Sequence, residues 1–549
     1  MNARTPAVLP GRLAALALVA ALAALVLPAR GPLRAEPGET PSTPRIALPA
    51  DPLTDRRGPE RPRPPNLVVI LADDLGWGDL GVYGQRLIRT PRLDRMADEG
   101  LRLTDFYSAA PICPPAREAL LTGRHTGHTR VRAFDGVLEP DSAAAPRYLP
   151  RFLASAGYAT GMFGKWGMGS YEVGEGGRAR VTAGAPERLG FAEFLGTMTH
   201  RDAHTYTLPP YPLRPGDEPI HGRLWTIRNG ATREARTSRV PYTQDAYLAA
   251  ALEFVRRHRD RPFFLYLPWT LPHAELYLPA DDPAWAGSLD SAGRSLFPEV
   301  PWRGDRTFRR PNPRPRATYA AMVSRLDRDV GRLLDLLDAL GLAEDTVVVV
   351  TSDNGPHSAG GIGGPAFFGS TGGLAGMKNT LFEGGIRVPA IVRWPGTVAA
   401  GRVADEPLAL WDLLPTFLEL AGVGRPGGID GLSTVPLLRG GEQPGHGAAS
   451  PLYWESFAGF RGQAARLGRF KALRGRLEAP DDRVRVYDLV DDPGERNDLA
   501  ADLAQRPELC PVYLELVRIL NAARTDPGGR LSFPPLREQC SAGAPPAGD

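Results

Sequence analysis

The chain has 549 residues, of which 42% are hydrophobic and 23% are charged, with a formal net charge of +3. This composition is typical of a soluble globular protein with one large domain and an appendage, and it excludes a wholly disordered chain. Because the net charge is small for this length, it gives no overall field toward nucleic acid or an anionic membrane, and we expect no nucleic-acid partner.

The N-terminus has the layout of a secretory signal peptide, which we place at residues 1–35. Arg4 and Arg12 lead into an uninterrupted apolar run from Leu13 to Leu27, and Pro28 and small or polar residues follow it. A membrane anchor is the alternative, but the run of 15 residues is shorter than the ~20 that span a bilayer. The sequence therefore predicts an exported protein, periplasmic or secreted, without a stable membrane anchor.

Proline, arginine and small residues dominate residues 36–65, which predicts a linker. The folded part then begins with Leu67 to Leu71, an apolar run typical of a strand buried on both faces, and similar runs recur at Phe263 to Leu267 and Thr346 to Val350. Apolar residues spaced by three and four from Met322 to Leu340 predict a helix. Strands that alternate with helices predict an α/β domain over residues 66–440, with a large mixed, mainly parallel sheet sandwiched by helices.

The pattern changes after about Gly440. A glycine-rich stretch is followed by short alternating segments at Pro451 to Trp454, Phe470 to Leu473 and Val484 to Leu489, which predict an antiparallel sheet. We interpret residues 441–549 as a small C-terminal α+β subdomain. Its two cysteines, Cys510 and Cys540, either form a disulfide in an oxidising compartment or stay as buried thiols.

Two polar clusters each follow directly on a predicted strand. Asp73 and Asp74 come after the first apolar run, and Asp353 and Asn354 come after the third. Groups at the carboxyl ends of strands in an open α/β sheet share one crevice, so these residues would meet. Their oxygen ligands suit calcium or magnesium and argue against zinc. The alternative is that each cluster caps a helix or a turn.

The third cysteine, Cys113, stands just before a short predicted helix, with Pro115 near its first turn and Arg117 one turn along. The start of a helix favours negative charge, and the guanidinium adds a fixed positive group. The segment therefore predicts an anion site that contains a nucleophile, and an unmodified thiolate is one alternative for that nucleophile.

The segment around Cys113 resembles the signature of the type I sulfatases of the alkaline phosphatase superfamily. Cys113-Pro114-Pro115-Ala116-Arg117 matches C-x-P-A-R, and Leu120 to Gly123 matches the L-L-T-G that follows. Further matches are a second signature from Gly157 to Trp166, NLVVILADDLG from Asn66, the segment Pro262 to His273, SDNG from Ser352 and EGGIRVP from Glu383. The resemblance extends from about Asn66 to Ala500 and implies an alkaline-phosphatase-like fold.

The resemblance also implies an activity and a set of roles. In this family the cysteine is oxidised by a maturing enzyme to formylglycine, whose hydrate attacks the sulfur of a sulfate monoester. Calcium would be held by Asp73, Asp74, Asp353, Asn354 and the modified Cys113. Arg117 and Lys165 would steady the hydrate, and His273 and Lys378 would bind the sulfate oxygens and assist the leaving alcohol. The implied function is that of an arylsulfatase-like sulfuric ester hydrolase that acts on a sulfated small molecule or a sulfated glycan.

One position departs from the family pattern. Many sulfatases have a histidine two positions after the signature lysine, where it helps to remove the second proton of the hydrate, but this chain has Gly167 after Lys165 and Trp166. Candidates for the base are His204, His128 or a water molecule, with a surface or structural role as the alternative for each histidine.

Substrate recognition is less marked in the sequence. Six arginines lie from Arg303 to Arg316 and would suit an anionic polysaccharide, or else belong to a solvated, proline-stiffened loop. Trp77, Trp166 and Trp269 adjoin the site motifs and are candidates to stack on a sugar or aryl ring, with core packing as the alternative. Two rival functions remain: a phosphonate or phosphate ester hydrolase of the same superfamily, and a non-catalytic glycan-binding homologue.

Overall fold

The computed structural model describes residues 63–134, 137–138, 148–208, 222–235, 239–447, 450–459, 461–475, 483–525 and 540. The predicted signal peptide and almost all of the predicted linker lie outside these residues, so both stay predictions. Within the described ranges, no helix is long and apolar enough to cross a membrane.

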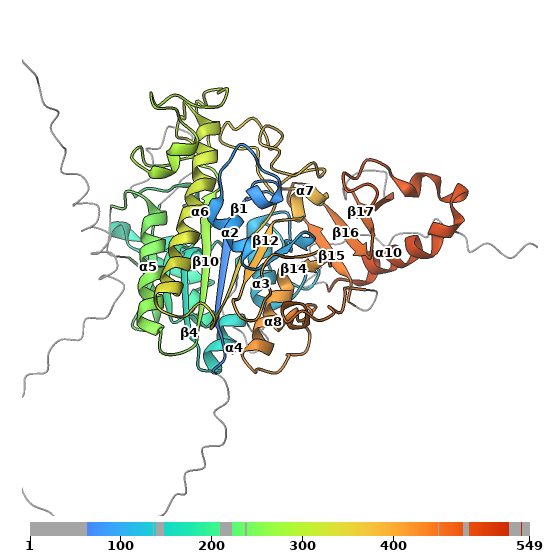
Figure 1. The fold of residues 1–549 in the computed structure, drawn as a ribbon, viewed down its shortest axis with the longest axis horizontal. Helices are drawn as coiled ribbons and strands as arrows, with labels where there is room; N and C mark the ends of the chain where they lie inside the picture. Colours follow the sequence, from blue (N-terminus) through green and yellow to red (C-terminus); the bar gives the residue numbers. More distant parts are fainter. Residues whose placement is uncertain are drawn as a thin grey trace, which may run out of the picture.

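The centre of the molecule is a ten-stranded sheet with the strand order β13-β2-β12-β11-β1-β10-β4-β7-β8-β9 (Figure 1). In chain order its strands are β1 (Asn66–Asp73), β2 (Leu101–Leu103), β4 (Ala159–Lys165), β7 (Glu193–Thr197), β8 (Trp225–Arg228), β9 (Ala231–Glu234), β10 (Phe263–Pro272), β11 (Thr346–Ser352), β12 (Ala390–Arg393) and β13 (Arg402–Ala404). Strands β11, β1, β10, β4 and β7 run parallel, whereas β12 and β8 join them antiparallel. The three predicted strands are β1, β10 and β11, and the prediction of a large mixed, mainly parallel sheet is confirmed.

Helices cover both faces of this sheet. The α-helices are α2 (Pro91–Asp98), α3 (Cys113–Thr122), α4 (Leu149–Ser155), α5 (Thr243–His258), α6 (Pro315–Ala339), α7 (Glu383–Ile386), α8 (Leu413–Leu420), α9 (Val435–Leu438) and α10 (Cys510–Ala522). Successive side chains of β1 alternate between two cores: Val68 and Ile70 pack with α2, α5 and α6, and Leu67, Val69 and Leu71 pack with α3, α4 and α8. Burial on both faces explains the continuous apolar run, and α6 is the predicted helix.

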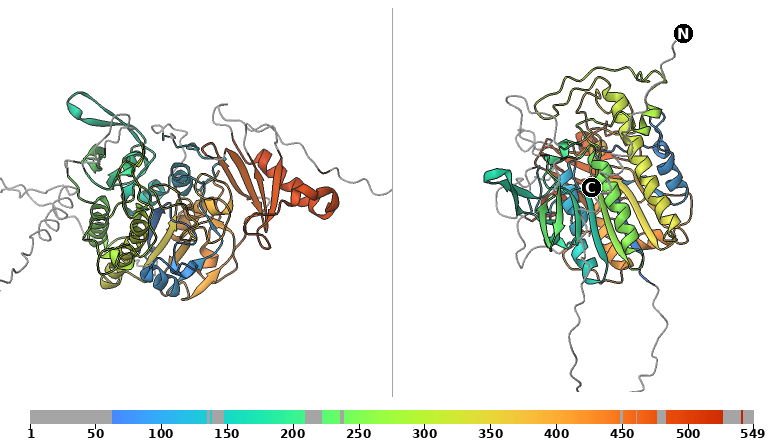
Figure 2. Two further views of the ribbon diagram at one scale, coloured as in Figure 1. Left: turned by 90° about the horizontal axis from the view of Figure 1, so that it is seen from above. Right: turned by 90° about the vertical axis from the view of Figure 1, so that its left-hand side faces the viewer.

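The C-terminal part forms a second, antiparallel sheet of β15 (Leu452–Ser456), β16 (Gly462–Leu467), β17 (Phe470–Arg474) and β18 (Val484–Asp488). Helix α10 packs on it, and Figure 2 shows this unit projecting from the main body. Cys510 and Cys540 form a disulfide, which decides between the two alternatives. The predicted division at residue 441 falls between α9 and β15. Strand β16 was not predicted, because its sequence GQAARL lacks an alternating apolar pattern.

Two small sheets complete the described strands. β3 (Phe106–Tyr107) pairs with β14 (Leu408–Ala409), and β5 (Ser170–Val173) pairs with β6 (Ala179–Ala183).

A buried ionic cluster joins the C-terminal sheet to the main body. The ammonium of Lys471 on β17 lies 2.9 Å from Oε1 of Glu383 on α7 and 2.9 Å from Oε1 of Glu495, and all three side chains are inaccessible to solvent. Tyr107 donates a hydrogen bond of 2.7 Å to the other oxygen of Glu383. This cluster connects β17 of the C-terminal sheet to α7 of the main body.

Candidate active site

The parallel pairing of β1 and β11 brings the two polar clusters together at the carboxyl edge of the sheet. The backbone N–H of Asp74 donates to Oδ1 of Asp353 at 3.2 Å, and the amide of Asn354 donates to Oδ1 of Asp74 at 2.7 Å. Asp74 has φ of 68°, a left-handed conformation that turns the chain sharply after the strand. Residues separated by about 280 positions therefore share one crevice, as the strand pattern predicted.

Helix α3 begins at Cys113, so the cysteine is the first residue of the helix rather than the residue before it. Ile112 is extended, Pro114 and Pro115 form the first turn, and Gly123 ends the helix in a left-handed conformation. The Cys113 side chain is 2% exposed, and its sulfur accepts a hydrogen bond of 3.3 Å from the ammonium of Lys165 at the end of β4. Burial raises the pKa of the Cys113 thiol.

Three cations neutralise the three carboxylates. The guanidinium of Arg117 lies 2.6 Å from Oδ2 of Asp353, the ammonium of Lys165 lies 2.6 Å from Oδ2 of Asp73, and the ammonium of Lys378 lies 2.6 Å from Oδ1 of Asp74. Burial lowers the pKa of Lys165, but the negative charges of Asp73, Cys113 and Asp353 together outweigh burial, so the net shift is upward. The three cations and the three carboxylates therefore balance one another in charge.

The oxygens of this cluster fit a hard divalent cation. Oδ1 of Asp73 and Oδ1 of Asn354 are buried and have no hydrogen-bond partner among the described residues. Leaving a buried acceptor unsatisfied costs about 1–3 kcal/mol. Ligand atoms of Asp73, Cys113 and Asp353 lie within 4.8 Å of one another. Calcium or magnesium prefers such oxygen donors and would satisfy both orphaned atoms.

A group of imidazoles faces the carboxylates from the other side. His273 follows β10; its Nδ1 donates to the carbonyl of Ala274, so Nε2 is the nitrogen 3.5 Å from Asp74. His204, at the end of the 3-10 helix η4 (Asp202–His204), stacks on His273 with 5.3 Å between ring centroids. Burial lowers the pKa of both histidines well below the usual value, so both imidazoles are neutral near pH 7.

These groups line a cavity of about 260 Å³. Its walls include Asp74, His200, His204, His273, Phe308 and Lys378. Sequence reasoning identified Asp74, His204, His273 and Lys378, whereas His200 and Phe308 carry no family motif that would have singled them out.

His357 was also missed, although it follows Asn354 by three positions and also lines the cavity. Its Nδ1 accepts the N–H of Ala359 at 3.0 Å, and its Nε2 lies 3.4 Å from the carbonyl of Pro272. Because both ring nitrogens are engaged by the backbone, His357 holds the cavity wall in place.

Comparison with known proteins agrees with this geometry. Residues 65–423 match the Sulfatase family model, and residues 377–520 match the family described as N-sulphoglucosamine sulphohydrolase, C-terminal. The chain belongs to the sulfatase family. Mouse steryl-sulfatase (Mus musculus) is 33% identical over 578 residues, covering 87% of this chain and 84% of the relative. Human arylsulfatase A (Homo sapiens) is 34% identical over 527 residues, covering 88% of this chain and 92% of the relative.

Among solved structures, Ps i-CgsB in complex with k-i-k-neocarrahexaose has 28% identity and a TM-score of 0.63, covering 83% of this chain and 92% of that chain. The sulfatase thus has the alkaline-phosphatase-like α/β fold and is an enzyme of the class that hydrolyses sulfate esters.

The histidine that many sulfatases carry after the signature lysine has no counterpart side chain here. Gly167 has φ of +79°, and a Cβ at this position would lie 3.6 Å from Cε of Lys165 and 3.8 Å from Cδ of Arg117. A side chain at Gly167 would therefore point into the active site. His204, the histidine candidate named from the sequence that lines the cavity, belongs to η4 and not to the segment after Lys165.

Two of the three tryptophans belong to the core. Trp166 and Trp269 are 0% exposed, and the indole N–H of Trp166 donates to the carbonyl of Gly184 at 2.7 Å. For these two tryptophans the structure supports the alternative of core packing, because neither side chain is exposed to a substrate. Trp77 is partly buried against Tyr83.

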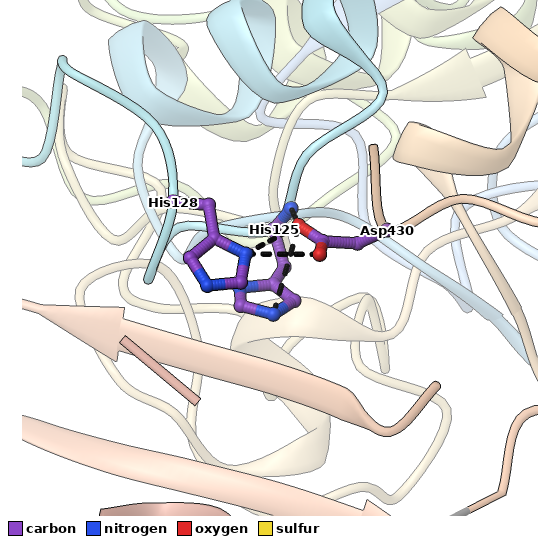
Figure 3. Close-up of side chains that lie close together, drawn as sticks. All are labelled: His125, His128 and Asp430. Carbon is purple, nitrogen blue, oxygen red and sulfur yellow. Dashed lines mark hydrogen bonds and ion pairs between the residues drawn. The ribbon is translucent and has the colours of Figure 1, made fainter. Parts of the chain in front are cut away.

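The structure places His128 in a different cluster, with His125 and Asp430 (Figure 3). Nδ1 of His128 lies 2.9 Å from both oxygens of Asp430, and Nε2 of His125 lies 3.6 Å from one of them. No contact that the structure gives His128 involves an active-site residue, so the geometry does not support it as the missing base.

This His-Asp-His cluster has the residue types of a zinc site, but its hydrogen bonds argue against one. Nδ1 of His125 accepts the N–H of Gly127 at 3.2 Å, and burial lowers the pKa of His125 to about 3. A neutral imidazole that accepts at Nδ1 carries its proton on Nε2, and a metal would need the lone pair there. We therefore interpret the cluster as a structural link between the segment after α3 and Asp430.

Proposed function

We propose that this sulfatase hydrolyses sulfate monoesters through a formylglycine formed from Cys113, with a calcium ion held by Asp73, Asp74, Asp353 and Asn354. The observation that carries the proposal is the position of Cys113. It begins a helix within a buried set of balanced ions, and the ammonium of Lys165 donates a hydrogen bond to its sulfur. The same cluster contains Oδ1 of Asp73 and Oδ1 of Asn354, which have no hydrogen-bond partner among the described residues. A structural cysteine needs none of these partners.

Each charged side chain has a place in this chemistry. The hydrated aldehyde would supply one hydroxyl to attack sulfur and a second hydroxyl whose proton loss releases sulfate. Calcium would supply positive charge for the oxygens of the sulfate group. Arg117 holds Asp73 and Asp353 in position, and the ammonium of Lys165 lies beside the reacting atom of residue 113. Lys378 and His273 face the cavity, where they would bind the sulfate oxygens and the leaving oxygen.

The balance of charge supports catalysis. Three carboxylates and a sulfate monoester carry −4 in total, whereas calcium with Arg117, Lys165 and Lys378 carries +5 when the histidines are neutral. The surplus of positive charge stabilises a deprotonated nucleophile and the charge that develops on the leaving oxygen.

The first test is the mass of the peptide that contains Cys113, from protein purified out of its own host. Formylglycine lowers the residue mass by ~18 Da relative to cysteine. A Cys113→Ala variant should keep its fold and lose hydrolysis of 4-nitrophenyl sulfate. Active protein with an unmodified thiol at this position would overturn the mechanism, and an alanine variant that keeps every function would favour a non-catalytic glycan-binding role.

His204 is our candidate for the proton acceptor that replaces the family histidine. It lies in the cavity wall beside His273, and burial lowers its pKa, so its imidazole is neutral and can accept a proton. Replacing His204 with alanine should lower kcat more than kcat/KM, with a burst of nitrophenol before slow turnover. His200→Ala is the matched control, since it removes another imidazole from the wall of the same cavity. Unchanged kcat in the His204 variant would remove it from this role.

The nearest rival is a phosphonate or phosphate ester hydrolase with the same fold. Rates on a 4-nitrophenyl sulfate and on a matched aryl phosphonate, measured side by side, separate the two. We further propose that the protein is exported, to the periplasm or outside the cell, and that a formylglycine-generating or other sulfatase-maturing enzyme acts on it. Co-expression with such an enzyme should raise the fraction of modified peptide.

A further inference from the structure

A short ordered loop forms one rim of the active-site cavity. Trp302 and Asn312 exchange two backbone hydrogen bonds of 2.8 Å, which close the loop at its base. Inside it, Oδ1 of Asp305 accepts the N–H groups of Thr307 at 2.8 Å and Phe308 at 2.6 Å. We call the segment from Trp302 to Asn312 the rim loop. These bonds hold it in one conformation without help from a partner.

Phe308 attaches the rim loop to the catalytic groups. Its ring centroid lies 5.2 Å from that of His204 and 6.1 Å from that of His273, and it lines the cavity beside them. Phe308 lines the cavity, so the residues that neighbour it in the rim loop lie next to the cavity.

The six arginines of this region divide into two groups. Four of them are used by the protein itself: Arg309 is buried, Arg310 pairs with Glu275 and covers the ring of Tyr277, Arg314 lies over Trp285 and Arg316 lies over Phe367. Arg303 and Arg306 are exposed, and neither has an acidic partner in the part of the chain that the structure describes. One carboxylate oxygen of Asp305, between them, already accepts two backbone N–H groups.

We propose that Arg303 and Arg306 form a subsite for a second anionic group of a polysulfated glycan whose scissile sulfate lies in the cavity. This inference rests on the proposed sulfatase function and names its substrate class. A cavity of about 260 Å³ holds a sulfate group and little more than one ring, so the rest of an oligosaccharide lies outside it. Arg306 is two residues from Phe308, which keeps their Cα atoms within about 7 Å.

The chemistry of the two side chains suits this ligand. A guanidinium offers a planar fork of N–H donors that matches the oxygens of a sulfate or carboxylate. Because Arg303 and Arg306 have no ion pair with any residue that the structure describes, a ligand gains their charge without displacing such a partner. A neutral steroid or a small aryl alcohol would leave both arginines unused.

The test measures binding and turnover separately. The probe is a fluorescently labelled carrageenan hexasaccharide with several sulfates, and its Kd is measured by anisotropy at low salt. The Arg303→Gln/Arg306→Gln double variant should bind it about tenfold more weakly, as expected for the loss of two exposed ion pairs. Its kcat/KM for 4-nitrophenyl sulfate should equal that of the native enzyme. The salt dependence of the Kd should also fall in the variant.

The matched control is Arg256→Gln/Arg332→Gln, which removes two exposed arginines from α5 and α6. An unchanged Kd in the rim variant, or an equal weakening in the control, would overturn the subsite. Because anisotropy needs no turnover, a native enzyme that binds the probe but fails to hydrolyse any sulfate would count against the proposed function and leave the subsite supported.

Discussion

Lys471 provides a sharp test of how the C-terminal sheet is held to the catalytic body. The chain has only three lysines, which are Lys165, Lys378 and Lys471; the rest of its 65 lysine and arginine residues are arginines. Lys471 is fully buried between Glu383 and Glu495. Replacing it with methionine keeps a similar chain length, removes the ammonium and leaves two carboxylates buried without it. Breaking a buried ion pair in this way costs about 3–5 kcal/mol of unfolding free energy.

The loss of unfolding free energy in the Lys471→Met variant should depend on pH. In the native protein burial raises the pKa of Glu495 to about 7; burial also raises that of Glu383, but Lys471 and Arg387 outweigh it and lower the pKa overall. Without Lys471, the folded-state pKa values of both carboxyl groups would be higher than in the native protein, and that of Glu495 already exceeds the unfolded value of about 4.3. The folded variant would then bind more protons than the unfolded chain, so its stability falls as pH rises. The deficit relative to the native protein should be larger at pH 8 than at pH 5.

Urea unfolding followed by tryptophan fluorescence at both pH values measures this effect. A Glu383→Gln/Lys471→Met/Glu495→Gln variant should recover part of the loss, because it removes the uncompensated charges as well. Two results would refute the reasoning. In the first, the unfolding free energy of Lys471→Met is within about 1 kcal/mol of the native value at pH 8, which is the scale of an exposed ion pair. In the second, the loss of unfolding free energy is the same at both pH values.

Three further predictions follow from single features. Chelation with EGTA should abolish hydrolysis of 4-nitrophenyl sulfate and added calcium should restore it; recovery with magnesium but not calcium would contradict the calcium assignment. Replacing Cys540 with serine should cost about 3–4 kcal/mol in calorimetry, because its disulfide to Cys510 closes a loop with sequence separation 30; a native Tm unaffected by reductant would speak against this. Replacing His128 with alanine should cost about 1–2 kcal/mol and leave kcat/KM unchanged. Stoichiometric zinc in the native protein, lost in that variant, would show that the His-Asp-His cluster binds metal after all.

The predictions from the sequence succeeded where the physical cause is local. A central strand such as β1 is buried on both faces, so its apolar run is continuous and easily recognised. Helix α6 is long enough for its apolar spacing to be unambiguous. Strand β16 was missed because it relies on small residues such as Ala464 and Ala465, whose burial leaves little pattern in the sequence.

The residues of the active site were likewise predictable from the sequence only where the cause is local. Asp73 and Asp353 could be brought together from the sequence, because each follows a strand and parallel strands end at one edge. For Trp166 the sequence left substrate stacking and core packing both open, and the structure buries it in the core, because neighbours in an extended segment point to opposite faces. His204 and His128 were equal candidates from the sequence.

The sequence by itself determined the α/β class, the polar clusters that follow the central strands and the types of charged residue that gather around Cys113. These features depend on periodicity and on short motifs within one segment. Only the tertiary structure decided that His204 reaches the cavity while His128 bonds to Asp430, and that Arg303 and Arg306 stay exposed while their neighbours are used internally. The physical reason is that such contacts join segments far apart in the chain, and the packing of the whole fold sets the distances between them.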